Sequence, residues 1–359
     1  MPSQALAPVR VFGNGIGGPV RSALTREKAM RRFLDGTGWQ NAIARPLAGD
    51  ASFRRYLRLI NSSDQSSRIL MDAPTDTCGS LDPFIRATNF LGKAGLSAPE
   101  IHATDKESGF LLLEDFGDAI VSRIVSDQPD QEAEIYGVAV DLLVELLDFD
   151  PGSGFPEYGP DVQSEIATQA LWWYQYAMTG NVPAVETGNE FRQIISRTAS
   201  ALGTGKAFIH RDYHAENLIW LPERTGVRRI GLIDHQDSSL GHPTYDLVSI
   251  LEDARRDVPA ELRDSLIHRY ALAVGRSEDE LLRELAICGA QRNLRIIGVF
   301  ARLALRDGKL GYIDLIPRVW RHLERDLSHP AVSELKQFAL RHLSPPDAAL
   351  LNRIRCMVS

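Results

Sequence analysis

Four polar residues with a defined spacing carry the most specific chemical signal in this sequence. His210, Asp212 and Asn217 lie in one polar stretch, and Asp234 ends a short apolar segment further along the chain. A carboxylate such as Asp212 can orient an attacking hydroxyl and accept its proton. An amide oxygen and a second carboxylate are hard oxygen ligands for Mg²⁺, which neutralises charge on nucleotide phosphates. The spacing therefore predicts phosphoryl transfer to an alcohol, with Asp212 as the base and Asn217 and Asp234 as magnesium ligands.

Two other interpretations of this stretch remain open. Polar residues after a strand also form ordinary solvated turns, although the apolar segments on both sides favour a functional loop. His210 and His214 are four residues apart, a spacing that binds zinc from one helix face, but no helix is indicated and no third ligand is obvious. We therefore expect His210 to stiffen the loop through hydrogen bonds.

The elements that must position this loop begin with a region of mixed patterns before residue 116. Helical apolar spacing occupies residues 25–36 and 83–94. Short apolar segments bounded by turn residues predict antiparallel strands at 42–47, 53–60, 68–71 and 110–113.

The rest of the chain is mostly helical in pattern. Apolar residues at i, i+3 and i+4 predict helices at 133–147, 162–178, 190–202, 247–254, 261–273, 278–305 and 315–327. Two strand-like segments, 207–209 and 229–233, interrupt them and flank the polar stretch. Loops on a rigid scaffold often carry function, so this interruption is the expected place of the active site.

Bulk composition is that of a globular protein. The chain has 359 residues, of which 44% are hydrophobic and 24% charged, and this length allows about two domains. A net charge of −7 argues against a nucleic-acid partner, and no apolar run reaches the roughly 18 residues of a membrane span. Three cysteines without a CxxC pair favour a reducing cytoplasm. The Gly/Pro-rich residues 1–22 are expected to form a loose extension rather than a secretory signal.

The motifs together resemble the aminoglycoside phosphotransferase and choline kinase family, a branch of the protein-kinase-like fold. The resemblance covers about residues 25–330, and its catalytic-loop and metal-binding patterns fall on the four polar residues named above. It implies an α+β fold of two lobes, with an antiparallel-sheet lobe at 23–115 that covers the nucleotide. A mostly helical lobe at 116–359 would hold the catalytic loop, the metal and the acceptor.

Three further segments fit the family pattern. Asp246, in the Pro-x-Tyr-Asp-Leu element at 243–247, is expected to brace the catalytic loop and to N-cap the helix at 247–254. Backbone groups near Glu114 and Phe116 look like the hinge that meets adenine. Gly49 and Ser52 lie where the family has its phosphate-covering loop.

Within the family, several short runs are similar to bacterial sugar kinases of cell-wall recycling. Those enzymes phosphorylate N-acetylmuramic acid and N-acetylglucosamine at the anomeric position. The matching runs are Gly-Asp-Ala-Ser-Phe-Arg-Arg-Tyr at 49–56, Met-Asp-Ala-Pro at 71–74, His-Arg-Asp-Tyr-His at 210–214 and the Asp-x-Gln-Asp pattern at 234–237.

One departure concerns the nucleotide phosphates. The wider kinase fold has a lysine on the third strand, paired with a glutamate on a helix of the same lobe. Here the third strand reads Arg-Ile-Leu-Met-Asp at 68–72, and the helix at 83–94 contains no glutamate. Because both halves of the ion pair are missing together, we expect a replacement, with Arg54 or Arg55 supplying positive charge. The alternative is a solvated strand arginine.

The acceptor side is less specific. Trp173 either stacks on a sugar ring or packs in the core. Glu165, Arg292 and Asn293 are polar residues on otherwise apolar helices, where they line the acceptor pocket or face water. Asp237 assists the metal or orients the acceptor. An arginine could pair with the carboxylate of a muramic acid, but the sequence does not indicate which one.

The sequence thus predicts a cytoplasmic kinase that uses ATP and Mg²⁺ to phosphorylate a hydroxyl of a small molecule, in particular the anomeric hydroxyl of an N-acetylated amino sugar. Its oligomeric state is not indicated. An aminoglycoside kinase, which needs an acidic pocket, and a choline-type kinase, which needs an aromatic cage, remain alternatives. A catalytically inactive nucleotide-binding scaffold is the alternative of another class.

Overall fold

The computed structural model describes residues 18–47, 54–203 and 205–358, and the chain divides into two compact units. The first contains residues 1–81 and 101–115, and the second contains residues 82–100 and 116–359. Residues 82–100 therefore pack with the helical unit, whereas the sequence analysis had placed them in the lobe at 23–115.

The first unit is built on an antiparallel sheet whose strand order is β1-β2-β3-β5-β4. Its strands are β1 (Ile43–Pro46), β2 (Arg55–Ile60), β3 (Ser67–Asp72), β4 (Ile101–Asp105) and β5 (Phe110–Glu114). The predicted antiparallel meander is confirmed, but β4 was missed. Its burial alternates residue by residue, and a short half-buried strand with few apolar residues gives a weak pattern.

Helix α1 (Gly18–Asp35) covers one face of this sheet. Leu34 on the helix forms a small core with Leu59, Leu70 and Leu112 on the strands. Because α1 begins at Gly18, the expected loose extension is wrong for residues 18–22. Residues 1–17 lie outside the described part of the chain.

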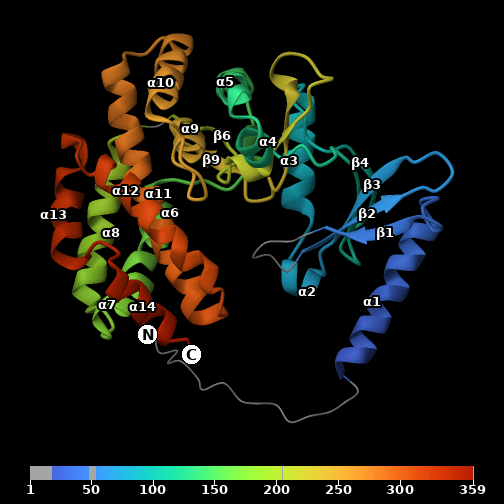
Figure 1. Cartoon of the computed structure of the whole chain (residues 1–359), viewed down its shortest axis with the longest axis horizontal. Helices are drawn as coiled ribbons and strands as arrows, with labels where there is room; N and C mark the ends of the chain where they lie inside the picture. The colour runs from blue at the N-terminus through green and yellow to red at the C-terminus, as the bar shows by residue number, and fades with distance from the viewer. Residues whose placement is uncertain (1–17, 48–53, 204, 359) are drawn as a thin grey trace. The chain divides into compact units, whose positions relative to one another are not determined.

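The second unit is mostly helical (Figure 1). Its helices are α3 (Asp82–Lys93), α4 (Val121–Asp127), α5 (Glu132–Glu145), α6 (Pro160–Ala167), α7 (Tyr176–Thr179), α8 (Val185–Ser200), α9 (Thr244–Leu251), α10 (Ala260–Val274), α11 (Glu278–Asp307), α12 (Ile316–Asp326), α13 (Ser333–His342) and α14 (Ala348–Cys356). The seven helices predicted after residue 116 are present in outline, with one exception.

That exception is the single helix predicted at 162–178. It is divided into α6, a π-helical segment at Ala170–Gln175 (η4) and α7. Gly298 on α11 packs against the start of η4, where a Cβ would lie only 2.2 Å from the carbonyl carbon of Gln169. The spacing of apolar residues does not report so close an approach between two backbones. The sequence therefore predicted one continuous helix at 162–178.

Two short ladders interrupt the helices and support the polar stretch. Strand β6 (Ala207–Ile209) pairs with β9 (Ser239–Gly241), and β7 (Leu218–Trp220) pairs with β8 (Ile230–Leu232), both antiparallel. The predicted segments at 207–209 and 229–233 are therefore strands, although they pair with β9 and β7 rather than with each other.

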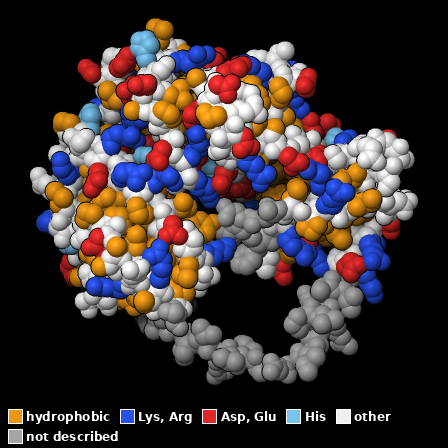
Figure 2. Space-filling view, in the orientation of Figure 1, with side chains coloured by type: hydrophobic (Ala, Val, Ile, Leu, Met, Phe, Trp, Pro, Cys, Tyr) orange, Lys and Arg blue, Asp and Glu red, His pale blue; other side chains and the backbone are white. Residues whose placement is uncertain are grey.

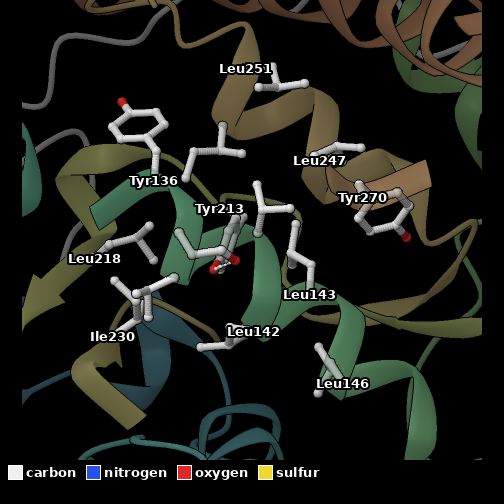
Figure 3. Packing of buried hydrophobic residues seen from close by; sticks show 14 of the residues in the cluster. Tyr136, Leu142, Leu143, Leu146, Tyr213, Leu218, Ile230, Leu247, Leu251 and Tyr270 are labelled. Carbon is white, nitrogen blue, oxygen red and sulfur yellow. Dashed lines mark hydrogen bonds between the residues drawn. The ribbon is translucent and has the colours of Figure 1, made fainter. Parts of the chain in front are cut away.

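The main core of the second unit lies around Tyr213, as Figure 3 shows. Leu142 and Leu143 on α5 and Leu247 on α9 belong to this cluster. Tyr213 is 1% exposed, so the polar stretch is anchored in the core by one of its own residues.

The visible surface in Figure 2 has basic and acidic side chains interspersed with apolar ones. Among the described residues, every helix is too short or too polar to cross a membrane.

Candidate active site

The loop after β6 is fixed on both sides of Asp212. Before it, the buried His210 ring contacts the carbonyl of Ile233 through Nε2 at 3.0 Å. After it, the Tyr213 hydroxyl donates to the carbonyl of Ala139 on α5 at 2.7 Å. Burial lowers the pKa of His210, so the ring is neutral and Nε2 is its donor nitrogen. The expected hydrogen bond from His210 across the loop is therefore present.

Asp246 braces the same loop from α9. Its carboxylate accepts the backbone N–H of His210 at 2.5 Å and that of Arg211 at 2.9 Å. The side chain is 1% exposed, and this burial raises its pKa to about 6. The expected brace is therefore present, but the expected N-cap is wrong. Helix α9 begins at Thr244, so Asp246 lies in its first turn and bonds to the loop rather than to its own helix.

The backbone at Arg211, the residue immediately before Asp212, is strained. Arg211 has φ of 73°, in the left-handed region that costs a non-glycine residue about 1–3 kcal/mol. The bond from its amide to Asp246 holds it there. Burial opposes ionisation of Asp212, but the positive charge of Arg295 on α11, helped by neighbouring side chains, lowers its pKa below the ordinary value. Asp212 is therefore ionised at neutral pH, as a proton acceptor must be.

Short hydrogen bonds gather the other predicted residues around Asp212. The Asn217 side chain donates through Nδ2 to the carbonyl of Asp212 at 3.0 Å. The Asn217 carbonyl accepts the N–H of Ile233 at 3.1 Å. Since Ile233 immediately precedes Asp234 and its carbonyl contacts His210, the structure brings all four residues to the same end of the β7–β8 ladder.

Asp234 is also held in a strained conformation. Its φ is 58°, and its Oδ1 accepts a hydrogen bond from Gln236 Nε2 at 2.9 Å. The next residue, His235, is fully buried, and its Nε2 contacts the hydroxyl of Thr88 on α3 at 2.7 Å. Helix α3 therefore anchors the segment that carries Asp234, through a hydrogen bond rather than through the ion pair that is absent from this chain.

Replacement of Thr88 by valine should lower the free energy of unfolding by about 1–3 kcal/mol, because it leaves a buried ring nitrogen of His235 without a partner. It should also lower kcat, since His235 follows Asp234 directly. Urea unfolding and steady-state kinetics measure both effects. Thr225→Val, an exposed position whose side chain makes no capping hydrogen bond, is the matched control. Equal stability of Thr88→Val and wild type would contradict this anchoring.

The residues present fit a divalent cation. The hydrogen bonds of Asn217 use Nδ2, which leaves its Oδ1 to face a ligand. Next to Asp234, the buried Oε1 of Gln236 has no hydrogen-bond partner among the described residues. Mg²⁺ is commonly bound by one or two protein oxygens together with phosphates and water. The described part of the chain contains no group of three or more His, Cys, Asp or Glu side chains placed to hold a metal ion, so phosphate and water would have to supply the remaining ligands.

Of the two candidate arginines in the first unit, Arg55 begins β2 and Arg54 immediately precedes that strand. Arg55 is paired in register with Asp72 and contacts its carboxylate, which also accepts from Arg26 of α1. Arg55 therefore lies on the face that α1 covers. Gly49 and Ser52 lie outside the described residues.

The hinge residues lie at the boundary between the units. Glu114 ends β5. The ring of Phe116 packs on Gly231 in β8, where an added Cβ would lie 2.8 Å from it. The guanidinium of Arg224 lies over the same ring, 5.0 Å from its centroid. The Phe116 side chain is therefore committed to packing in the second unit.

Most of the expected acceptor residues are engaged elsewhere. Trp173 packs against a core cluster, and Glu165 forms an exposed ion pair with Arg192. Arg292 and Asn293 are buried and donate to Glu252, so the structure does not bring them to an open surface. Asp237 is exposed, and its backbone carbonyl accepts a hydrogen bond from Arg211 Nη1 at 3.1 Å.

Comparison with known proteins identifies the family. The sequence profile of the phosphotransferase enzyme family matches residues 43–285. The chain belongs to this family. An N-acetylmuramate/N-acetylglucosamine kinase of Caulobacter vibrioides is 36% identical over 370 aligned positions, which cover 89% of this chain and 97% of the relative. A kinase of the same name from Pseudomonas aeruginosa is 32% identical and covers 81% and 86% of the two chains.

Solved structures show the fold of this phosphotransferase. A choline kinase of Streptococcus pneumoniae aligns with a TM-score of 0.59 at 14% identity, covering 85% of this chain and 100% of its own. An aminoglycoside phosphotransferase of Streptomyces rimosus, solved with ADP and streptomycin, aligns at 0.52 with 16% identity, covering 77% and 98%. The predicted kinase-like α+β fold is confirmed, and the chain is a small-molecule kinase.

Sequence reasoning missed three residues near the loop that carries Asp212. Arg295 on α11 donates to the hydroxyl of Tyr245 at 3.3 Å, and that hydroxyl lies 3.2 Å from the hydroxyl of Tyr158. A signal was present in part, because Tyr245 precedes Asp246 in the Pro-x-Tyr-Asp-Leu element. Arg295 had no local signal, since it lies in a long helix more than eighty residues after Asp212.

Proposed function

We propose that this kinase transfers the γ-phosphoryl group of ATP to the anomeric hydroxyl of N-acetylmuramate and N-acetylglucosamine. The observation that best supports the chemistry is the hydrogen-bonded convergence of Asp212, Asn217 and Asp234 at one end of the β7–β8 ladder. Relatives of that name, at 30–36% identity, support the choice of acceptor.

In this mechanism, Asp212 orients the sugar hydroxyl and accepts its proton as the oxygen–phosphorus bond forms and ADP leaves. An anomeric hydroxyl is more acidic than an ordinary alcohol, so a single ionised aspartate is a sufficient base. Asn217 and Asp234 would hold Mg²⁺, which when bound neutralises negative charge on the phosphates. The convergence of all three residues argues against an inactive scaffold, which does not need them together.

The first unit supplies the nucleotide-covering part in this proposal. We assign the phosphate-contacting role to Arg54 rather than Arg55, because Arg55 is bound to Asp72 on the face that α1 covers. The backbone around Glu114 and Phe116 is proposed to meet adenine. We place the enzyme in the cytoplasm, where ATP is available and where Cys78, Cys288 and Cys356 would stay reduced.

The proposal is tested by ADP release from the purified chain with Mg-ATP and one acceptor at a time. We expect N-acetylmuramate and N-acetylglucosamine to stimulate release well above the rate without acceptor. Kanamycin and choline serve as acceptors for the two alternative substrate classes. Stimulation by kanamycin or choline alone would contradict the proposed acceptor, and no stimulation by any of the four would contradict the proposed reaction.

A further inference from the structure

Arg295 lies near the loop that carries Asp212, and among the described residues its guanidinium forms no ion pair with a carboxylate. In the part of the chain that the structure describes, its hydrogen bonding consists of one bond from Nη1 to the Tyr245 hydroxyl. A guanidinium carries five N–H donors in a planar fork, so most of its hydrogen-bonding capacity is unused. Burial raises the pKa of Tyr158, which keeps that neighbouring phenol neutral and unable to balance the charge.

The position of Arg295 relative to the loop is fixed by two tyrosines. Tyr245 lies next to Asp246, whose carboxylate holds the amides of His210 and Arg211. The rings of Tyr158 and Tyr245 pack edge to face, with centroids 5.0 Å apart. The guanidinium is therefore linked, through Tyr245 and the adjacent Asp246, to the backbone of the loop that carries Asp212.

Arg295 and Asp212 attract each other without forming an ion pair. Each affects the ionisation of the other, yet no N···O contact within 4.0 Å joins them among the described residues. A separated cation and carboxylate suit an acceptor that offers a hydroxyl to the carboxylate and an anionic group to the cation. N-acetylmuramate has this form, because its lactyl carboxylate at C3 and its reacting hydroxyl at C1 belong to the same ring.

Other arginines near the loop are less suited. Arg211 stacks on the ring of Tyr158, 4.5 Å from its centroid, and donates to the carbonyl of Asp237. Arg292 is buried and donates to the carbonyl of Glu252. Arg295 is the one of these three whose donors are not taken by a backbone carbonyl.

We propose that Arg295 binds the carboxylate of the acceptor and sets the preference of the enzyme for N-acetylmuramate over N-acetylglucosamine. This inference rests on the proposed function. A fork of two charge-assisted hydrogen bonds to the carboxylate would explain the choice of arginine at this position. N-acetylglucosamine lacks the lactyl group and reaches Asp212 without this contact.

The test compares the two sugars in the same variant. Arg295→Gln also removes a charge that favours ionised Asp212, but that effect acts on both sugars and cancels in the ratio of their kcat/KM values. We expect the ratio of N-acetylmuramate to N-acetylglucosamine to fall about 10- to 100-fold, the usual effect of a lost hydrogen bond to a charged group. Arg295→Lys, which keeps the charge without the fork, should give an intermediate ratio.

Two controls keep the result interpretable. Arg197→Gln removes an exposed arginine of α8 that pairs with Glu334 and should leave the ratio unchanged. The wild-type enzyme should also discriminate against the neutral lactyl amide of N-acetylmuramate by a similar factor, a measurement that does not depend on folding of a variant.

An equal loss for both sugars, or no loss for either, would overturn the inference while leaving the proposed function in place. Equal use of the acid and its amide by the wild type would overturn it as well. If the wild type phosphorylates neither sugar, the proposed function itself fails, and the inference fails with it.

Discussion

Asp212→Asn should lower kcat by about 10²- to 10⁴-fold, the usual contribution of a positioned general base. Asparagine keeps the size of the side chain, and the loop is held by His210, Tyr213 and Asp246 rather than by the Asp212 carboxylate. Folding should therefore be preserved. Steady-state kinetics with N-acetylglucosamine and calorimetric titration with ATP measure the two effects separately.

The matched control for this variant is Asp264→Asn, on α10, whose side chain is 74% exposed. It should behave like the wild type in both assays. If Asp212→Asn keeps more than about a tenth of the wild-type kcat, the assignment of the base is wrong. If nucleotide affinity falls in parallel with kcat, Asp212 contributes to binding rather than to proton transfer.

Asp246→Asn should lower kcat by about 100-fold, as expected for a small misplacement of the base. The amide of asparagine accepts one backbone N–H through Oδ1, but its NH₂ faces the second N–H, so one buried donor loses its acceptor. The free energy of unfolding should fall by about 1–3 kcal/mol for the same reason. Kinetics and urea unfolding test both effects, with Asp264→Asn again as the control.

The raised pKa of Asp246 also predicts how the kcat of the wild-type enzyme depends on pH. Burial raises the pKa of Asp246 to about 6, and protonation places an O–H against a backbone donor. We therefore expect kcat to fall as the pH is lowered through about 6. Asp212 does not cause this fall, because its pKa is lowered. Persistence of the same fall in Asp246→Asn would contradict the assignment.

Lowering the pH is expected to change the contribution of Asp246 to stability in the opposite direction to its effect on kcat. Its folded-state pKa lies above the ordinary value of 3.8, so the folded chain binds more protons between these two values. Its contribution to the free energy of unfolding therefore grows as the pH falls through this window. The loss of activity near pH 6 should therefore occur without unfolding through this group, and circular dichroism at each pH checks that the chain stays folded.

The parts of the fold and site that were predictable are those encoded locally. Asp212 and Asn217 are five residues apart in one loop, and Asp234 follows a strand within hairpin distance, so their convergence could be inferred from spacing. The antiparallel sheet of the first unit is likewise built from neighbouring segments with clear apolar patterns.

The parts that were missed depend on contacts between distant segments. Helix α3 joins the second unit because Thr88 bonds to His235 and Phe84 stacks on its ring at 4.4 Å, pairings that no local pattern reports. Arg292 and Asn293 looked like pocket residues because they interrupt an apolar helix. They instead satisfy the buried Glu252. Arg295, three residues after Arg292 on the same helix, contacts Tyr245 instead. Which side of α11 faces the loop depends on how that helix packs, and the local sequence does not report this.

The most direct test of the central claim is phosphorus NMR of the product formed from N-acetylglucosamine, Mg-ATP and the wild-type enzyme. Transfer to the anomeric hydroxyl predicts one new phosphate resonance coupled to the anomeric proton, in equal amount to the ADP formed, and its absence with Asp212→Asn. A phosphate coupled to another carbon's protons, or free phosphate in place of a sugar phosphate, would contradict the account.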